Sequence, residues 1–436
     1  MPLVPRVLAL ATLLALTACS GDDAPQATPT PVLPPFVPPE QLTPRPTSTP
    51  VTPEPSPTPF PPVSLVPFDP AQPLSEDTGY LYDTADGAYY RIDGLFGGSW
   101  SLDSKAVAAS RSCAGDGFVE VLDIVENASV RAEICSAVNL TWSPGGSRIG
   151  FVVIRPPEDA GVYAMDRDGA NIRRLVAREG VGDIRWLADG AIAYEAGEGL
   201  FPKEIDAYYR VDLGSGAVTE LTFQDPVTAE DPRIVFGDTA ASGIWVAFED
   251  GDATYLWSAA TGVTMQIGEG ETVVEWAPRG DRAMVTSFRE DEVWPRWQLV
   301  DPGAGTISDL PGVGIGAQWM SDGVRIAHMG FQCYVDGPRT FDVTVFDTRD
   351  GTSRVLTATP DAREWHFRVS PTAPVAAFER IDLDADIRFL YLLDLDSGEL
   401  QLLIEAPDAG EDLGPGQWSP DGRYLQFFHG GGGEGC

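Results

Sequence analysis

Three histidines, His328, His366 and His429, have the clearest potential for metal chemistry in this 436-residue chain. Imidazole nitrogens are good ligands for zinc and other transition metals. The three residues do not form a short ligand motif, so a metal site would need a fold that brings them to one end of the molecule. Isolated histidines are more commonly packed or solvated. We therefore predict no metal and no cofactor, and keep the three histidines as alternative metal ligands.

Carboxylates offer a second kind of chemistry. The run Asp382-Leu-Asp384-Ala-Asp386 has the oxygen ligands that calcium prefers, but it lacks the glycine and the terminal glutamate of an EF-hand loop, which favours a solvated loop. The sequence has no Gly-x-Ser-x-Gly nucleophile elbow and no phosphate-binding loop between a strand and a helix. We predict that the protein is not an enzyme. The alternative is a polysaccharide lyase or another glycan-active enzyme that uses acidic residues or the three histidines.

The charge balance limits the classes of partner. There are 29 basic and 65 acidic residues, which gives a formal net charge of −36. Binding to nucleic acid requires Lys and Arg to replace counterions on the phosphates, so nucleic acid is not expected as a partner. The same argument excludes adsorption to anionic lipid head groups. At 43% hydrophobic residues, the chain has enough apolar side chains to form a core.

The N-terminus has the features of an export signal. An apolar run from Val7 to Ala15 follows Arg6 and is too short to span a bilayer. The next residues, Leu16-Thr17-Ala18-Cys19, resemble the lipobox of bacterial lipoproteins, in which the cysteine becomes the acylated first residue. The resemblance implies a signal peptide over residues 1–18 and a lipid on Cys19, with Ser20 favouring the outer membrane in a two-membrane cell. An ordinary signal peptide is the alternative.

Residues 19–64 have the composition of a spacer. Of the 44 residues from Ser20 to Val63, 16 are proline, mixed with Thr and Ser. Proline lacks a backbone donor and fixes φ, so this segment cannot form a helix or a central strand. It favours polyproline II at roughly 3.1 Å per residue, or on the order of 130 Å in all. We predict a disordered stalk between Cys19 and a globular domain over residues 65–436.

The globular domain is a repeat. A motif built on a tryptophan, then Pro, Asp and Gly, returns every 40 to 50 residues and is clearest at Trp418-Ser-Pro-Asp421-Gly422. The hallmark tryptophans are Trp100, Trp142, Trp186, Trp276, Trp319 and Trp418. Degenerate copies lie at Gly237-Asp238 and Val369-Ser370-Pro371. This period is the size of one four-stranded propeller blade.

A second motif follows each first one. It is a short alternating strand that ends in Asp and a glycine turn, as in Val343-Thr-Val-Phe-Asp347-Thr-Arg-Asp350-Gly351. Apolar residues at a period of two, bounded by Asp-Gly turns, are typical of hairpins. Each blade is therefore expected to have four strands, A to D, with the hallmark Trp at the end of strand A.

Together the two motifs resemble the PD40 (WD40-like) repeats of TolB-type β-propellers. The resemblance covers residue 78 to the C-terminus and implies an all-β propeller with a partner-binding role. Eight copies of each motif predict eight blades, with seven as the alternative. The last repeat stops after strand B, and the segments Gly79–Asp83 and Tyr89–Ile92 look like an unattached C and D pair. A closed ring has no free edges, so we predict that the N-terminal strands complete the last blade.

Four cysteines remain after Cys19, and an exported protein is permitted disulfides. Cys113 and Cys333 lie 13 and 14 residues after a hallmark Trp, in expected B–C loops, and Cys135 lies in an expected D–A linker on the same face. We predict a Cys113–Cys135 bridge and a Cys333–Cys436 bridge, with free thiols as the alternative.

Polar residues stand just before the hallmark position in several copies. They are Arg185, Glu275, Gln318, Arg368 and Gln417. They either contact a ligand near the axis of the ring or only end strand A, and the second interpretation is favoured. The predicted function is a monomeric, lipid-anchored, extracytoplasmic binding module at the bacterial cell envelope. Its partner is an envelope protein, a peptide or a glycan, and it lies in the outer membrane facing the periplasm or on the outer face of the cytoplasmic membrane.

Overall fold

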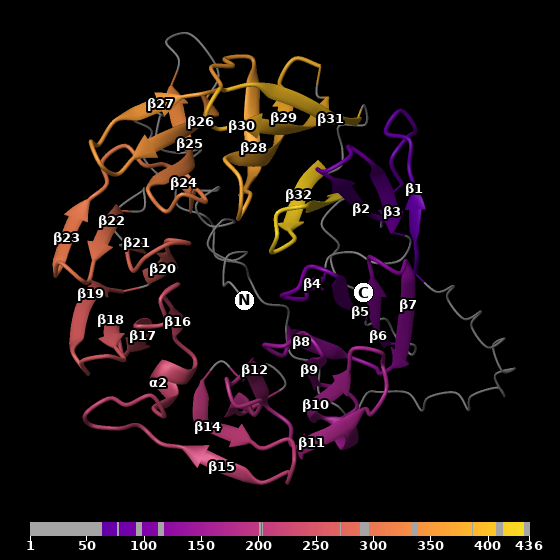
Figure 1. The fold of residues 1–436 in the computed structure, drawn as a ribbon, viewed down its shortest axis with the longest axis vertical. Helices are drawn as coiled ribbons and strands as arrows, with labels where there is room; N and C mark the ends of the chain where they lie inside the picture. Colours follow the sequence, from indigo (N-terminus) through magenta and orange to yellow (C-terminus); the bar gives the residue numbers. More distant parts are fainter. Residues whose placement is uncertain are drawn as a thin grey trace, which may run out of the picture. The chain divides into compact units, whose positions relative to one another are not determined.

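The computed structural model describes residues 63–436 except 76–77, 93–97, 112–116, 200–201, 203, 271, 288–295, 334–338, 386, 407–412 and 431–436. The chain divides into two units, Met1–Pro61 and Pro62–Cys436, and all described residues belong to the second. The predictions for the signal peptide, for Cys19 and for the stalk up to residue 62 therefore lie outside the described residues. The second unit is a ring of eight antiparallel sheets (Figure 1).

The first four blades follow one another along the chain. Blade 1 is β4 (Ser99–Trp100), β5 (Ala106–Arg111), β6 (Phe118–Asp123) and β7 (Ala128–Glu133). Blade 2 is β8 (Ala137–Trp142), β9 (Arg148–Val153), β10 (Gly161–Asp166) and β11 (Arg173–Ala177). Blade 3 is β12 (Val181–Trp186), β13 (Ile192–Gly197), β14 (Ile205–Val211) and β15 (Val218–Leu221). Blade 4 is β16 (Asp238–Thr239), β17 (Trp245–Asp250), β18 (Ala253–Ser258) and β19 (Thr264–Glu269).

The next three blades have the same strand order. Blade 5 is β20 (Thr272–Trp276), β21 (Ala283–Ser287), β22 (Arg296–Asp301) and β23 (Thr306–Asp309). Blade 6 is β24 (Ile315–Trp319), β25 (Arg325–Cys333), β26 (Arg339–Asp347) and β27 (Ser353–Val355). Blade 7 is β28 (Ala362–Val369), β29 (Val375–Asp382), β30 (Arg388–Asp394) and β31 (Leu400–Ala406).

Blade 8 joins the two ends of the ring. It contains β32 (Leu413–Trp418) and β33 (Tyr424–His429) from the C-terminus, and β1 (Leu65–Pro67), β2 (Thr78–Asp83) and β3 (Tyr89–Ile92) from the N-terminus. β2 pairs with β33, so that Tyr80 lies opposite Phe427 and Tyr82 opposite Leu425. The Tyr80 and Phe427 rings stack with centroids 5.1 Å apart. The predictions of eight blades and of closure by the N-terminal strands are both confirmed.

The first strand of each blade lies nearest to the axis of the ring (Figure 1). We call these the inner strands: β4, β8, β12, β16, β20, β24, β28 and β32. The core lies between neighbouring blades rather than at the axis. Between blades 1 and 2, for example, Val119 and Val121 belong to the same buried cluster as Trp142, Ile149 and Phe151. Removing this apolar surface from water is the main force that joins one blade to the next.

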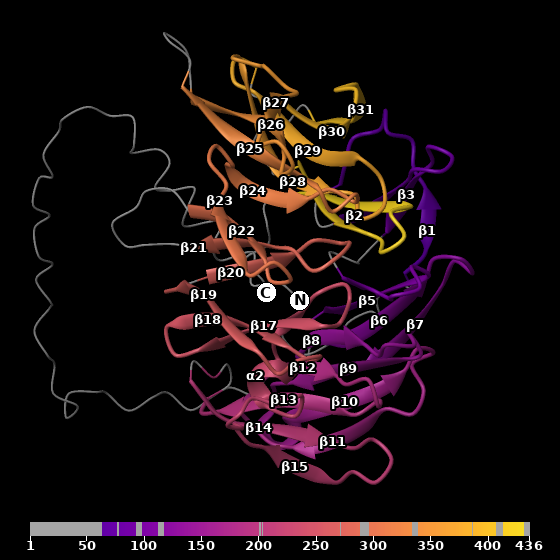
Figure 2. The ribbon, with the colours of Figure 1, turned by 60° about the vertical axis from the view of Figure 1, so that its left-hand side comes forward.

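β1 is a fifth strand that the sequence did not predict. It pairs antiparallel with β3, with Leu65 opposite Ile92, and lies outside it (Figure 2). Val63 is buried and its N–H donates to a carboxylate oxygen of Glu120 in blade 1 at 3.0 Å. Asn127, also in blade 1, accepts from the Leu65 N–H and donates to the Leu65 carbonyl at 3.1 Å. β1 therefore fastens blade 8 to blade 1.

Blade 4 contains the most degenerate repeat. Its inner strand β16 has two residues and no hallmark Trp. The segment before it contains α2 (Pro232–Val235), a single helical turn whose Arg233 N–H is capped by the buried Asp231 carboxylate. The other helical element among the described residues is the short η2 (Pro157–Asp159). No helix in the described part of the chain is long and apolar enough to cross a bilayer.

Candidate functional site

The Trp-Ser-Pro-Asp-Gly motif is a turn that fixes the end of each inner strand. At Ser419 the hydroxyl donates to the Asp421 carboxylate at 2.6 Å and accepts from the Tyr424 N–H at 2.9 Å. Gly422 has a φ of +72°, and a Cβ there would collide with the Thr372 side chain of blade 7. The position therefore needs glycine both for its backbone and for the close approach of the neighbouring blade.

The hallmark tryptophans join each blade to the one before it. Five indole N–H groups donate to a backbone carbonyl on the inner strand of the preceding blade, at 2.8 to 3.2 Å. The pairs are Trp142 to Ser99, Trp186 to Thr141, Trp276 to Asp238, Trp319 to Glu275 and Trp418 to Arg368. The motif thus has a structural role.

We call the interface between two neighbouring blades a seam. Two seams lack the indole because blades 4 and 7 have Thr239 and Val369, instead of Trp, at the hallmark position. At these two seams, the polar residue just before the hallmark position of the preceding blade makes the contact instead. The Arg185 guanidinium donates to the Gly237 carbonyl at 2.9 Å. The Gln318 amide donates to the Phe367 carbonyl at 2.9 Å and accepts from the Val369 N–H at 2.9 Å. The Arg185 and Gln318 side chains therefore have a structural role between neighbouring blades.

Glu275 is also engaged between blades. Its carboxylate accepts from the Trp319 N–H at 3.0 Å. Burial raises the pKa of this carboxyl to about 7, and the hydrogen bond from Trp319 opposes the shift only in part. The group therefore titrates near neutral pH, where its ionisation costs free energy because the charged form is buried.

Arg368 and Gln417 are different from the other three. Arg368 makes one side-chain hydrogen bond, to the carbonyl of its neighbour Phe367 at 3.0 Å, and no ion pair with any described residue. Burial lowers the pKa of its guanidinium below the usual range. Gln417 is exposed on the inner strand of blade 8. Of the five predicted site residues, these two have side chains that make no hydrogen bond to a neighbouring blade among the described residues.

The histidines do not form a common site. His366 lies within β28, at a bulge between Trp365 and Arg368. His328 lies within β25, is buried, and accepts a hydrogen bond from the Gly314 N–H at 3.0 Å; burial lowers its pKa to about 4. His429 is the last residue of β33 and is buried. Among the described residues, no three His, Cys, Asp or Glu side chains are grouped closely enough to bind a metal ion.

His366 is instead part of a charged cluster on one side of blade 7. Its Nδ1 lies 3.0 Å from the Glu379 carboxylate, which is fully buried. Glu379 also accepts from Arg388 at 2.6 Å and from the Leu413 N–H of blade 8 at 3.1 Å. Burial alone would raise the pKa of Glu379, but its hydrogen bonds to His366 and Arg388 hold it below the usual value. His366 has a φ of +48°, unusual for a non-glycine residue.

A second buried carboxylate lies on the same blade. Glu364 is fully buried and accepts from the Arg380 guanidinium at 2.9 Å and from the Thr359 hydroxyl at 2.7 Å. Sequence analysis singled out neither Glu364 nor Glu379. The available signal was the placement of Glu beside Arg in otherwise apolar alternating strands, since buried carboxylates require a partner.

The acidic segment considered as a calcium site begins with a hydrogen-bonded turn at Asp382. Asp382 ends β29, and its carboxylate accepts from the N–H groups of Asp384 and Ala385 at 2.9 and 2.8 Å. These bonds fix the loop without an ion. Asp386 lies outside the described residues.

The disulfide predictions are not tested. Cys135 is exposed in the linker between blades 1 and 2, as expected, whereas Cys113 and Cys436 lie outside the described residues. Cys333 is the last residue of β25, because the strand continues into the segment that was expected to be a loop. The two bridges remain predictions.

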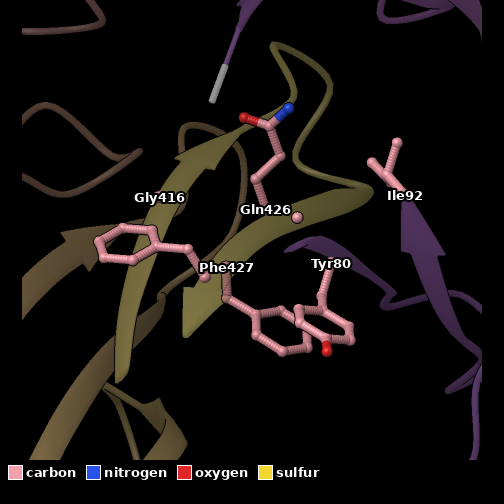
Figure 3. A pocket seen from close by; sticks show the side chains of 7 residues that line it. Tyr80, Ile92, Gly416, Gln426 and Phe427 are labelled. Atoms are coloured by element: carbon pink, nitrogen blue, oxygen red, sulfur yellow. The ribbon is translucent and has the colours of Figure 1, made fainter. Parts of the chain in front are cut away.

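A small cavity of about 30 Å³ lies within blade 8. Figure 3 shows Tyr80 and Phe427 stacked beside it, with Gln426, Ile92 and Gly416 around it. This volume holds about one water molecule. The cavity is a packing feature of the closing blade rather than a ligand pocket.

The chain is similar to several solved structures at low sequence identity. Similar solved structures include a TolB protein from Agrobacterium tumefaciens, with 13% identity, a TM-score of 0.28, and coverage of 81% of this chain and 97% of that one. TolB from Acinetobacter baumannii has 17% identity, a TM-score of 0.31, and coverage of 75% and 80%. An oligogalacturonate lyase in complex with manganese has 13% identity, a TM-score of 0.42, and coverage of 84% and 96%. No protein-family model and no curated protein matches the sequence.

Proposed function

We propose that this chain is a lipid-anchored binding module of the bacterial cell envelope. In this proposal an acyl group on Cys19 holds the protein at a membrane, residues 19–64 form the spacer, and the propeller binds a protein, peptide or glycan. The lipobox-like sequence Leu16-Thr17-Ala18-Cys19 and the proline content of the spacer support the anchoring part.

The observation that carries the binding part is the contrast among the residues before the hallmark position. Arg185, Glu275 and Gln318 make hydrogen bonds to the next blade. Arg368 and Gln417 occupy the equivalent positions of blades 7 and 8, and their side chains make no such bond within the described residues. A rigid repeating frame with uncommitted polar side chains at equivalent positions is how repeat proteins present a binding surface.

Anchoring is tested in the native host or in a lipoprotein-processing host. The full-length chain should partition with membranes, and mass spectrometry of its N-terminal peptide should show acyl groups on Cys19. Cys19→Ala should release the protein into the soluble fraction. Retention of this variant in the membrane would refute lipid anchoring.

Binding is tested by site-specific photocrosslinking in cells. A photoreactive amino acid replaces Gln417 on the inner strand of blade 8, and the matched control replaces Val218, which is 47% exposed on the outer strand of blade 3. A discrete adduct at position 417 that is absent at 218 supports a partner at the inner strands. Equal labelling at both positions, or none at 417, would count against it.

A glycan-active enzyme is the second candidate, favoured by one observation. His366 is held by the buried Glu379 carboxylate, the arrangement that orients a histidine for proton transfer. Purified protein is assayed on acidic and neutral polysaccharides for new reducing ends and for unsaturated products. Turnover that disappears in His366→Ala supports this candidate, whereas turnover that survives in that variant excludes His366.

A further inference from the structure

β28 is the most basic inner strand in a strongly acidic protein. It contains Arg363, His366 and Arg368 within eight residues, while the net charge of the chain is −36. Across the other inner strands, the single basic residue is Arg185. Positive charge is therefore concentrated in one sector around the axis.

The two arginines of β28 lack a carboxylate partner among the described residues. Arg363 makes no hydrogen bond or ion pair with them, and its Nε is buried without an acceptor. Arg368 donates only to the Phe367 carbonyl. Arg185, in contrast, lies 3.5 Å from the Asp238 carboxylate. Partial burial of an unpaired cation is unfavourable, so such a group is retained where it has another use.

The nearby carboxylates are already engaged. Glu364 is paired with Arg380 and Glu379 with Arg388, so neither needs Arg363 or Arg368 to balance its charge. Arg363 and Arg368 are both partly exposed. An incoming anion therefore has two guanidinium groups to pair with and displaces no existing ion pair.

We propose that β28 is a binding site for an extended acidic peptide segment, whose carboxylates pair with Arg363 and Arg368. This inference rests on the binding role proposed above and specifies its ligand. A guanidinium binds a carboxylate through two parallel hydrogen bonds. The two arginines are five residues apart on one strand, or about 16 Å at about 3.3 Å per residue, less the effect of the bulge.

The strand geometry favours a peptide over other polyanions. β28 is the edge strand of its sheet, with β29 on one side and the axis on the other. Gln318 and Trp418 already bond the backbone of this edge beside Arg368, so a peptide would be held there by the arginine side chains. A peptide in extended conformation has the same rise per residue as β28 and can place two acidic side chains at the spacing of the arginines. A single small carboxylate reaches one arginine at a time.

The test uses fluorescence polarisation with the propeller-containing full chain and labelled ten-residue peptides. Each peptide carries two Glu residues separated by three to seven positions, and a matched series carries Gln instead. Because of the bulge, Arg363 and Arg368 lie opposite Ile381 and Ala377, four residues apart on the regular strand β29, so binding should be tightest near a separation of four. It should be at least tenfold weaker for the Gln series and weakened by added salt.

The variants are Arg363→Gln and Arg368→Gln, and the control is Arg279→Gln, an exposed arginine outside β28. The first two should each weaken peptide binding at least fivefold, while the control remains within twofold of wild type. Because Arg363 and Arg368 are unpaired, their variants should melt at the wild-type temperature or above it. A strong fall in melting temperature would instead assign them a structural role.

Three outcomes of the binding assay would overturn the site, and one outcome of the crosslinking experiment would do so as well. One is the absence of peptide binding, and the second is binding that is indifferent to both arginine variants. The third is arginine-dependent binding of hyaluronan oligosaccharides with no binding of any peptide, which would assign the site to a glycan. A crosslinked partner at position 417 that persists in both arginine variants would overturn the β28 site and leave the broader binding role standing.

Discussion

At the seam between blades 8 and 1, contact is spread over several small interactions between distant parts of the chain. The Trp100 and Tyr424 rings stack 5.9 Å apart, and the Asp421 N–H donates to the Ser104 hydroxyl at 2.9 Å. β1 adds hydrogen bonds to Glu120 and Asn127. Each of these contacts is modest, and many must be lost before the seam opens.

At the seam between blades 3 and 4, contact is concentrated in a short insertion. Phe236 packs on Tyr208 of blade 3, with centroids 5.4 Å apart, and Arg185 reaches the Gly237 carbonyl. The insertion itself is held by the fully buried Asp231, which accepts hydrogen bonds from Arg233 and from the Gln224 N–H. One ionised side chain organises this whole region.

This difference between the two seams predicts opposite responses to mutation. The closing seam should tolerate single substitutions and fail when a whole segment is removed. The blade 4 seam should fail when one buried charge is removed, because Arg233 then keeps only its more exposed ion-pair partner.

The largest expected effect comes from removing the closing strands. Deletion of residues 63–95 removes β1, β2 and β3 and exposes the edge of β33. Half of blade 8 is then missing, so cooperative thermal unfolding should disappear and the protein should aggregate. Calorimetry and circular dichroism measure this. Deletion of residues 21–60 is the control and should leave the melting temperature unchanged. Equal stability of the two truncations would show that the N-terminal strands do not close the ring.

The next effect is a single substitution in blade 4. Asp231→Ala should cost about 3 kcal/mol in the free energy of unfolding, because it leaves Arg233 with only the more exposed Asp250. At the closing seam, Asn127→Ala should cost about 1 kcal/mol, because it removes neutral and partly exposed hydrogen bonds. Denaturant titration gives both values. Similar costs would mean that the two seams do not differ in kind.

The seam between blades 5 and 6 adds a titratable contact to the comparison. Because the folded state raises the pKa of Glu275 to about 7, it binds the proton more tightly than the unfolded chain does. This contribution is present below the unfolded pKa, about 4.3, and is lost as the pH rises through about 7. Relative to Glu275→Gln, wild type should therefore lose roughly 2 kcal/mol between pH 5 and pH 8, after allowance for partial exposure. A constant difference across this range would contradict the raised pKa.

The smallest expected effect is the difference in unfolding free energy between substitutions at two equally buried tryptophans. Trp142 and Trp100 are 6% and 7% exposed, but the Trp142 indole donates to Ser99, whereas the Trp100 indole nitrogen has no acceptor among the described residues. Trp142→Phe should therefore cost about 1 kcal/mol more than Trp100→Phe. The two variants are compared by denaturant unfolding of the full chain. A larger cost at Trp100 would mean that closure depends on that residue more than the structure indicates.

Much of the fold followed from local chemistry. The Trp-to-Trp spacing and the Asp-Gly turns are short-range signals, so they predicted the number of blades, and the unmatched segments Gly79–Asp83 and Tyr89–Ile92 predicted the closure. β1 was missed because three residues, Leu65–Pro67, next to a proline-rich segment carry no strand pattern of their own. Its pairing depends on β3 and blade 1, which only the closed ring supplies.

The candidate site was less predictable. Arg185 and Arg368 occupy equivalent positions in the repeat, yet one joins two blades and the other does not. The difference depends on which residue the neighbouring blade offers, and the local sequence does not contain that information. The same holds for Glu364 and Glu379, whose partners are set by strand register across β28, β29 and β30.

The hydrogen bonds of the hallmark tryptophans follow the order in which the chain is synthesised. Every indole N–H that finds a carbonyl finds it on a blade made earlier by the ribosome, as Trp142 does at Ser99 and Trp418 at Arg368. Each new blade thus arrives with a donor for an acceptor that already exists. Trp100 is the exception among the hallmark tryptophans, since the blade before it in the ring is completed last, and its indole has no acceptor among the described residues. The ring can therefore grow blade by blade in the order of synthesis, and only its closure must wait for the end of the chain.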